Sequence, residues 1–524
     1  MRSTPKLATL LLLAGIGCRT ANPELPDRPA RVQPEVYERL DLSSSALLEP
    51  TPPVLGVIAT NEDVAAPLPA DGLHLEDVLT SVERHFPLIL AAEQEIDLAE
   101  ARALRARGAF DTRLNAGGRS DALGYYQNDR LDVELEQPTR LWGSTFSGGY
   151  RIGKGDFASY DGEEKTNDDG ELRLGVKVPL LQGRAIDKRR IAEWRARLER
   201  ERAEPLILQK RLEVTKKAAD AYWRWVAWTE SREIARLLLA LAEDRQDQVE
   251  RAVEEGQVAP IAIADNQRSI VDRRSKLVKA QRGVEKSAIK LSLYWRDERG
   301  WPLVPSDTGE SVDFPPARDP VQVFVPGDVD LALAQRPELR ALELEIASLE
   351  LERSLAENDR LPTLDFGVKA SQDFGDAASS PDDKEDLELK ALVTLNVPLQ
   401  RRSAIGKQRE AEAKIAKLQR ELQYGRELTT SAVQDAVSAL TQSWAQLEQA
   451  RENVRLADLL AEAERVQLRA GESDLFRVNV REQQAAVAAA GVVEVLEEHF
   501  RSLALYRVVL GIPFAAEGSP SFAR

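Results

Sequence analysis

The chain contains one stretch twice, and this repeat limits its possible folds more than any other feature of the sequence. The residues around Pro179 reappear around Pro398, at an offset of 219 positions. The two copies then stay aligned without a gap for many turns of a helix, so that Trp225, for example, aligns with Trp444. Internal similarity over this distance indicates two tandem structural repeats.

Each copy is expected to begin as a strand and to continue as a helix. Apolar and polar residues alternate over 171–179 and 387–397, which is the period of a strand with two unlike faces. After each proline the apolar residues follow the 4-3 spacing of a heptad seam. In the first half this seam comprises Val214, Ala218, Ala221, Trp225, Trp228, Ala235, Leu238 and Ala242. In the second half it comprises Val433, Val437, Leu440, Trp444, Leu447, Val454, Ala457 and Ala461.

Both long helices should end at a glycine, Gly256 in the first half and Gly471 in the second, after which a second helical segment returns. At 1.5 Å of rise per residue, a helix of roughly 65–70 residues is ~100 Å long. Pro205 and Gly425 weaken the two helices at nearly the same depth. Because this length exceeds an ordinary globular core, we predict two long antiparallel coiled-coil hairpins.

Composition narrows the class of protein. Charged residues make up 30% of the chain and aromatic residues only 6%, a balance that favours coiled coils over the dense core of an enzyme. The formal net charge of −16 leaves no basic stripe for phosphates, so we expect no nucleic-acid partner. Beyond the leader, no apolar run approaches the ~20 residues of a spanning helix, so a membrane-spanning part would have to be a barrel.

Residues 1–17 are predicted to be a signal peptide, with Arg2 and Lys6 before an apolar run. The segment resembles a bacterial lipoprotein signal, in which small residues precede a cysteine that becomes acylated. Cys18, the sole cysteine, is therefore the predicted lipidation site, and cleavage by the general signal peptidase is the alternative. Arg19 follows instead of the aspartate associated with inner-membrane retention, which favours the outer membrane.

Proline-rich residues divide the rest of the chain. We expect an extended N-terminal arm over 18–72, for which simple disorder is the alternative. The first repeat is predicted over 73–300 and the second over 328–514, joined by a linker at 301–327 and followed by a tail at 515–524. Each repeat should run through a helix, strands, a long helix and a return helix.

The strands are expected within 112–180 in the first repeat and within 363–399 in the second. The first repeat holds about thirty extra residues between its strands. They include two strand-like runs, Leu131 to Leu135 and Phe146 to Ile152, together with turn-rich clusters of glycine and aspartate. The extra segment could therefore be a long surface loop or an additional hairpin.

Motifs of chemistry are weak in this sequence. Residues 148–154 nearly spell a phosphate-binding loop, but Gly155 stands where that loop needs serine or threonine, and no helix follows. His74, His85 and His499 are too scattered for a catalytic zinc site. We therefore predict a protein that is not an enzyme, with no catalytic residue, metal site or cofactor.

Two residue clusters each have a structural and a functional interpretation. Trp223, Trp225, Trp228 and Trp444 could form a ligand cage, but Trp225 and Trp228 lie on the heptad seam, which favours packing in the core. The acidic run 382–386 lies between two predicted strands and is typical of a solvated external loop. Weak binding of a divalent ion is the alternative for that run.

The repeated order of helix, strand pair, long helix and return helix, behind an export signal, resembles the TolC-like family of outer-membrane efflux and secretion channels. The matching residues are the strand exits Val178-Pro179-Leu180 and Val397-Pro398-Leu399, the turn Leu468–Ser473 with Gln483, and Gly256 with Gln267. The resemblance implies a mainly α fold with a small β part. In this fold three copies together close one α-barrel, made of the helical hairpins, and one transmembrane β-barrel. Trimerisation also suits the strands, since two short strand pairs cannot close a barrel and open edges in lipid are costly.

The resemblance also implies a function. Family members are passive trimeric ducts of a tripartite efflux pump or a type I secretion system, located in the outer membrane and extending into the periplasm. The implied partners are two further copies of the chain, a periplasmic adaptor (membrane fusion) protein, an inner-membrane pump of RND or ABC type and outer-membrane lipid. A periplasmic coiled-coil adaptor and a purely structural coiled coil are the alternatives, although tandem hairpins separated by amphipathic strands argue against both.

Family members dock their adaptor at the turns of the helical hairpins. Carried over, the docking positions are Gly256, Gln257, Val258, Ala259, Gly471, Glu472 and Ser473, and ordinary hairpin turns are the alternative. The family's constriction often has acidic residues just beyond the second turn, where this chain has Arg477 and Val480, followed by Arg481. We therefore hypothesise a mixed constriction of Asp265 with Arg477 and Arg481, three copies of each converging near the axis. Solvated surface charges are the alternative.

Overall fold

The structure is a computed structural model that describes residues 65–66, 72–158, 164–306, 313–376 and 386–514. The signal peptide with Cys18, the C-terminal tail, nearly all of the N-terminal arm and most of the acidic run 382–386 lie outside the described residues. The chain divides into two units, 1–59 and 60–524, and every described residue belongs to the second.

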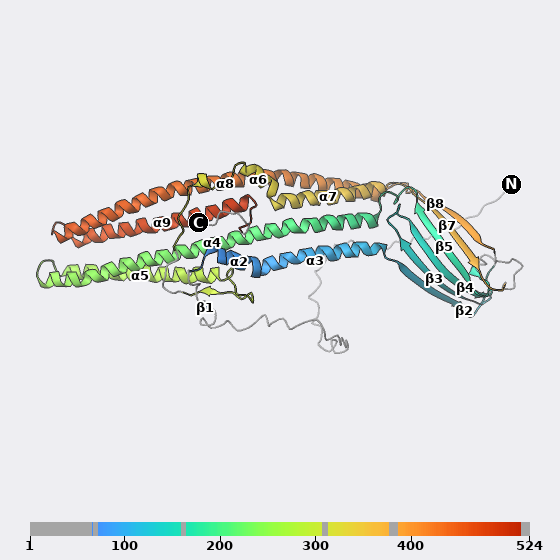
Figure 1. Ribbon diagram of the computed structural model, residues 1–524, viewed down its shortest axis with the longest axis horizontal. Helices are drawn as coiled ribbons and strands as arrows, with labels where there is room; N and C mark the ends of the chain where they lie inside the picture. Colours follow the sequence, from blue (N-terminus) through green and yellow to red (C-terminus); the bar gives the residue numbers. More distant parts are fainter. Residues whose placement is uncertain (1–64, 67–71, 159–163, 307–312, 377–385, 515–524) are drawn as a thin grey trace, which may run out of the picture. The chain divides into compact units, whose positions relative to one another are not determined.

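After the two-residue strand β1, the first half of the described chain contains two helices, four longer strands and then a long helical hairpin (Figure 1). The leading helices are α2 (Leu75–His85) and α3 (Pro87–Arg107), followed by the short 3-10 helix η2 (Gly108–Phe110). The strands are β2 (Arg113–Asp121), β3 (Asn128–Pro138), β4 (Thr145–Gly155) and β5 (Glu171–Pro179). The hairpin consists of α4 (Lys188–Glu254) and α5 (Ile261–Leu291).

The second half repeats this order with two strands. Its helices are α6 (Asp328–Gln335) and α7 (Pro337–Asn358), its strands β7 (Thr363–Asp373) and β8 (Glu388–Asn396), and its hairpin α8 (Arg402–Arg469) and α9 (Leu475–Val509). Between the halves lie β6 (Val304–Pro305), which pairs in parallel with β1 (Ala65–Ala66), and the 3-10 helix η4 (Pro320–Gln322).

The two long helices form as the heptad seams predict. Helix α4 has 67 residues and continues through Pro205, and α8 has 68 residues and continues through Gly425. Half of each seam is buried within a single copy of the chain, and the other half is partly buried. The buried seam residues are Val214, Ala218, Trp225 and Ala242 in α4, and Val433, Leu440, Leu447 and Ala461 in α8.

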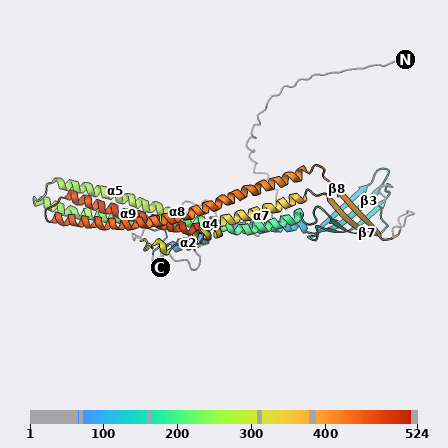
Figure 2. The ribbon, with the colours of Figure 1, turned by 90° about the horizontal axis from the view of Figure 1, so that it is seen from above.

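The helices pack in two sets that share α4 and α8. Next to the sheet, α3 packs against α4, α4 against α7, and α7 against α8. Farther along, α5 packs against α4, α4 against α9, and α9 against α8, so the two hairpins lie side by side (Figure 2). Within the described residues, none of the helices combines the length and the apolar character that crossing a bilayer requires.

The main hydrophobic core lies where α2, α4, α5 and α9 meet. Trp223 of α4 is buried at its centre, with its ring stacked 4.5 Å from Phe500 of α9 and 5.6 Å from Phe314, measured between ring centroids. The ring of Trp228 occupies the space that a side chain at Gly283 of α5 would fill. Trp223, Trp225 and Trp228 of α4 therefore pack between helices, which is the core role favoured by the seam.

The six longer strands form one antiparallel sheet in the order β2-β3-β4-β5-β7-β8. The extra segment of the first repeat, left open between a loop and a hairpin, contributes the paired strands β3 and β4. Of the two alternatives, the structure therefore has the additional hairpin, so the first repeat supplies four strands and the second supplies two. The physical reason is the alternation over Leu131–Leu135 and Phe146–Ile152, which extends the two-faced pattern of the neighbouring strands.

Candidate functional site

The first hairpin turn, here called the first tip (residues 255–260), is closed by a Schellman motif. Gly256 adopts a left-handed conformation with φ of 69°, where glycine avoids the clash of a side chain. Its N–H donates to the Val253 carbonyl at 3.0 Å, and the N–H of Gln257 donates to the Ala252 carbonyl at 2.8 Å. The predicted docking residues 256–259 are all exposed.

The second tip (residues 470–474) has the same construction. Gly471 has φ of 77°, its N–H donates to the Leu468 carbonyl at 3.0 Å, and the N–H of Glu472 donates to the Gln467 carbonyl at 2.9 Å. Gly471 and Glu472 are exposed, whereas Ser473 is half-buried and its hydroxyl donates to the Glu464 carboxylate. The repeat is thus preserved down to the hydrogen bonds that end each long helix.

Large apolar side chains are exposed beside both tips. Phe476, in the first turn of α9, is 75% exposed, and Ile261, the first residue of α5, is 67% exposed. Val258 and Val480 are also exposed. Exposed apolar side chains next to a polar turn are typical of a protein-binding surface, and Phe476 and Ile261 were not among the residues predicted from the sequence.

The charged residues predicted for a constriction lie near the tips and form separate contacts. Asp265 is exposed on α5. The Arg477 guanidinium lies 3.7 Å from Asp474, whose side chain caps α9 by accepting from the Arg477 backbone N–H at 2.9 Å. Arg481 lies 3.8 Å from Glu464 of α8. Among the residues that the structure describes, no ion pair joins Asp265 to either arginine, so one copy alone does not assemble the hypothesised constriction.

A buried charge cluster joins the two hairpins a few turns from the tips. Glu482 of α9 is 1% exposed, and its carboxylate contacts an arginine from each of the three other long helices. These are Arg245 of α4, Arg273 of α5 at 3.1 Å and Arg465 of α8 at 3.1 Å. Asn479 accepts a further hydrogen bond from Arg245 at 2.7 Å. One carboxylate therefore links all four helices of the two hairpins.

The surroundings of Glu482 keep it ionised. Burial alone would raise the pKa of its carboxyl, but the hydrogen bond and charge of Arg245, together with the hydrogen bonds of Arg465 and Arg273, outweigh burial and lower that pKa. Such a cluster is sensitive to the loss of one partner, because the remaining charges would stay buried without compensation.

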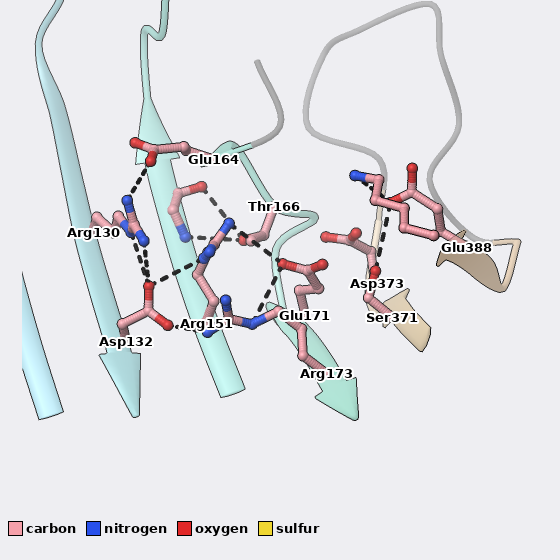
Figure 3. A network of polar contacts seen from close by, with 12 residues as sticks. Arg130, Asp132, Arg151, Glu164, Thr166, Glu171, Arg173, Ser371, Asp373 and Glu388 are labelled. Carbon is pink, nitrogen blue, oxygen red and sulfur yellow. Dashed lines mark hydrogen bonds and ion pairs between the residues drawn. The ribbon is translucent and has the colours of Figure 1, made fainter. Parts of the chain in front are cut away.

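The sheet has two unlike faces. The strand register places every second residue of each strand on a common side, and one side is apolar across all six strands. Its exposed large residues are Leu114, Leu131, Leu135, Phe146, Tyr150, Leu172, Leu174, Phe366, Leu389, Val393 and Leu395. The opposite side carries mostly charged, polar and glycine residues, several of which form the network drawn in Figure 3. We call these sides the apolar face and the polar face.

Comparisons with known proteins bear on these features. Residues 329–498, which run from α6 through β7, β8 and α8 into α9, match the family model of the outer membrane efflux protein. No curated protein matches the chain.

Several solved structures of outer-membrane channels have a similar fold. The outer-membrane channel OprN is 14% identical, with a TM-score of 0.62 over 83% of this chain and 89% of its own. The outer membrane protein VceC of Vibrio cholerae is 14% identical, with a TM-score of 0.59 over 84% of this chain and 96% of its own. The open state of the MtrE channel of Neisseria gonorrhoeae is 13% identical, with a TM-score of 0.59 over 84% and 89%. At these identities the likeness establishes the fold.

Long hairpins in two repeats and a two-faced sheet define a helix-rich fold of the channel type. The resemblance predicted from the sequence is confirmed for the fold: residues 329–498 match the model of the outer membrane efflux protein, and the described chain has the fold of the solved channels. The predicted fold class, mainly α with long antiparallel hairpins and a small β part, is confirmed as well.

Glu482 gives a first testable prediction. The Glu482→Gln variant leaves the buried arginines without a carboxylate, so the free energy of unfolding should fall by ~3–5 kcal/mol. Thermal unfolding of the purified protein measures this loss. Because the folded-state pKa of Glu482 is lowered, the stabilisation is present above the unfolded pKa and is lost as the pH falls through the folded pKa. The gap between wild type and variant should therefore shrink in acid.

Glu452→Gln is the matched control. Glu452 lies on α8, the helix that packs against α9, and forms a surface ion pair with Arg455 at 2.7 Å. It should unfold like the wild type, because exposed ion pairs contribute little. Equal unfolding temperatures for Glu482→Gln and Glu452→Gln would show that the cluster does not hold the hairpins together.

Proposed function

We propose that this chain is the protomer of a trimeric outer-membrane duct that exports substrates passively across the periplasm and the outer membrane. The family of residues 329–498 and the fold support a channel. The sequence resemblance, together with the features of the sheet and the tips, favours a trimer that works in a tripartite efflux pump or a type I secretion system.

The observation that carries the proposal is the open, two-faced sheet. Its apolar face exposes eleven large hydrophobic side chains, more than a surface in water normally carries as one patch. Strands of 9 to 11 residues match the length of a tilted membrane strand. Lipid against the apolar face and water against the polar face would satisfy both sides.

The edges of the sheet support closure by further copies. Strands β2 and β8 form the two edges, and every residue of β8 is exposed. In lipid, unpaired backbone N–H and C=O groups cost several kcal/mol each. The strand order makes β2 and β8 antiparallel to each other, so β8 of one copy can pair with β2 of the next in a head-to-tail ring. Three copies, the number that the resemblance implies, would close one β-barrel and one α-barrel.

The tips support a partner at the other end of the hairpins. Gly256, Gln257, Val258, Ala259, Gly471, Glu472 and Ser473, together with the exposed Ile261 and Phe476, form the surface proposed for a periplasmic adaptor. An inner-membrane pump of RND or ABC type would complete the assembly. The proposed location is the outer membrane and periplasm, with an acyl anchor at Cys18.

The central test is channel activity in lipid. The full-length protein, extracted from the outer membrane in detergent, should migrate as a trimer and form discrete channels in planar bilayers. A Val393→Arg variant places a charge on the apolar face, costing up to ~2–4 kcal/mol at the bilayer midplane, and should lose membrane assembly.

Thr394→Arg is the control, because Thr394, next to Val393 in β8, lies on the polar face and is also exposed. It should still form channels. A wild-type protein that is monomeric and soluble without detergent, or a Val393→Arg variant that inserts as well as Thr394→Arg, would contradict the duct.

The hypothesised constriction of Asp265, Arg477 and Arg481 has its own test. Arg477→Glu reverses a charge that three copies would bring near the axis, so the ion selectivity of the channel should shift toward cations. Glu452→Gln, a change far along α8 from the second tip, is the control and should leave selectivity unchanged. Unchanged selectivity of Arg477→Glu would assign these residues to the solvated surface.

A further inference from the structure

The number of strands in one copy determines the width of the barrel, an inference that rests on the proposed function. Three copies of a six-stranded sheet give a barrel of eighteen strands. With strands 4.8 Å apart and tilted by about 40°, such a barrel is roughly 35 Å across between backbones, against about 24 Å for twelve strands. The hairpin β3–β4 thus widens the barrel by about half, enough for a broad aqueous opening.

The same hairpin carries a dense charge cluster on the polar face. The Asp132 carboxylate accepts hydrogen bonds from three arginines: Arg130 at 2.6 and 2.9 Å, Arg151 of β4 at 3.1 Å, and Arg173 of β5. Glu171 lies 3.8 Å from Arg151. All of these side chains are less than a third exposed, so they pack against one another on the sheet rather than extending into solvent.

The cluster also holds a neighbouring segment of the chain. Residues 164–170 precede β5, at the end of the sheet opposite the helices, and Glu164 forms an ion pair with Arg130 (Figure 3). The N–H of Thr166 donates to the Gly153 carbonyl at 3.0 Å, and the Thr166 hydroxyl accepts from the Gly153 N–H at 3.1 Å. On its other side, the N–H of Asn167 donates to the Asp373 carboxylate of β7 at 2.9 Å.

Gly153 shows on which face the start of this segment lies. Gly153 pairs with Arg130 in the sheet register, so a side chain at position 153 would project from the polar face. The backbone oxygen of Glu164 occupies the space of that side chain. The start of the segment therefore lies directly over Gly153 on the polar face, the side that would face the interior of the barrel. At its other end, the carbonyl of Asp169 accepts a hydrogen bond from the hydroxyl of Tyr150, which belongs to the apolar face, so the segment follows the end of the sheet from one face to the other.

We propose that residues 164–170, whose first residue Glu164 is held over the polar face by Arg130, form a constriction at the end of the barrel far from the helices. The three copies of the segment narrow the opening that the hairpin β3–β4 widens. The cluster contains three arginines and three carboxylates, those of Asp132, Glu164 and Glu171, so its charges balance within one copy. The constriction limits the size of the hydrophilic solutes that pass, and Lys165, Asp168 and Asp169 add a net charge of −1 to the segment in each copy.

The test measures the largest polyethylene glycol that enters the pore, read from its effect on single-channel conductance of the full-length protein in planar bilayers. Asp132→Ala removes the centre of the cluster, and Gly153→Val fills the space under the segment without changing any charge. Both should raise the size limit for polyethylene glycol added on the side of that end of the barrel, because the segment no longer narrows its opening.

Glu134→Gln is the matched control. Glu134 lies two residues from Asp132 on the same face of β3, so this variant removes the same charge but leaves the cluster intact. Its size limit should equal that of the wild type. If Asp132→Ala and Gly153→Val assemble as trimers, checked by gel migration, and keep the wild-type size limit, the constriction is refuted. A wild type that forms no channels would instead refute the proposed function.

Discussion

The rest of the structure depends on how the backbone groups at the two edges of the sheet find hydrogen-bond partners. A sheet of six antiparallel strands has two edges, β2 and β8, whose outward N–H and C=O groups need partners. Water could supply them, but in the proposed duct the apolar face of the same strands lies against lipid, which cannot. The two properties are compatible only if the edges pair with another copy, and the antiparallel order of the edges allows that pairing to close into a ring. Within the proposed duct, trimerisation is therefore a condition for burying the sheet in lipid.

The helices satisfy a related requirement over a greater length. A long helix with a narrow apolar seam is stable only when neighbours cover the seam, and in one copy half of each seam is buried. Next to the sheet, the neighbours of α4 are α3 and α7, and beyond them they are α5 and α9. Glu482 and its three arginines then join the hairpins near the tips. Beyond the aromatic core around Trp223, the contact between the two hairpins is therefore stabilised by these specific polar contacts.

Much of this fold could be predicted because its signals are local and repeated. The alternation around Val176 and Val393, the heptad seams and the glycines at both tips each follow from elementary geometry, and the offset of 219 positions let one half support the other. The hairpin β3–β4 could not be settled in this way, because it occurs in one half only and has no counterpart for comparison. What defines β3 and β4 as strands is their pairing with β2 and β5, which lie next to them in the sheet.

The site was less predictable for a different physical reason. Glu482 lies among many charged residues of α9, and its burial depends on arginines 17 to 237 positions away in sequence. Likewise, Asp132 and Glu164 resemble ordinary surface charges until the strand register brings Arg130, Arg151 and Arg173 to them. Long-range charge pairing of this kind leaves no periodic signal. The exposed Phe476 beside the second tip also has no signature in sequence beyond its own hydrophobicity.

Crosslinking between the edge strands tests the central claim most directly. Ala116 of β2 and Ala391 of β8 both lie on the apolar face, and five strand spacings separate the two strands within one copy, about 24 Å at 4.8 Å per spacing. Cysteines at both positions, treated in the membrane with a shorter thiol crosslinker, can therefore be joined only between copies. If β8 pairs with β2 of the next copy, crosslinking of the double-cysteine variant gives products of two and three chains and none larger. Each variant with only one of the two new cysteines gives no crosslinked product beyond the background that Cys18 produces. A chain that remains uncrosslinked, or a ladder that continues beyond three, would contradict a closed trimeric ring.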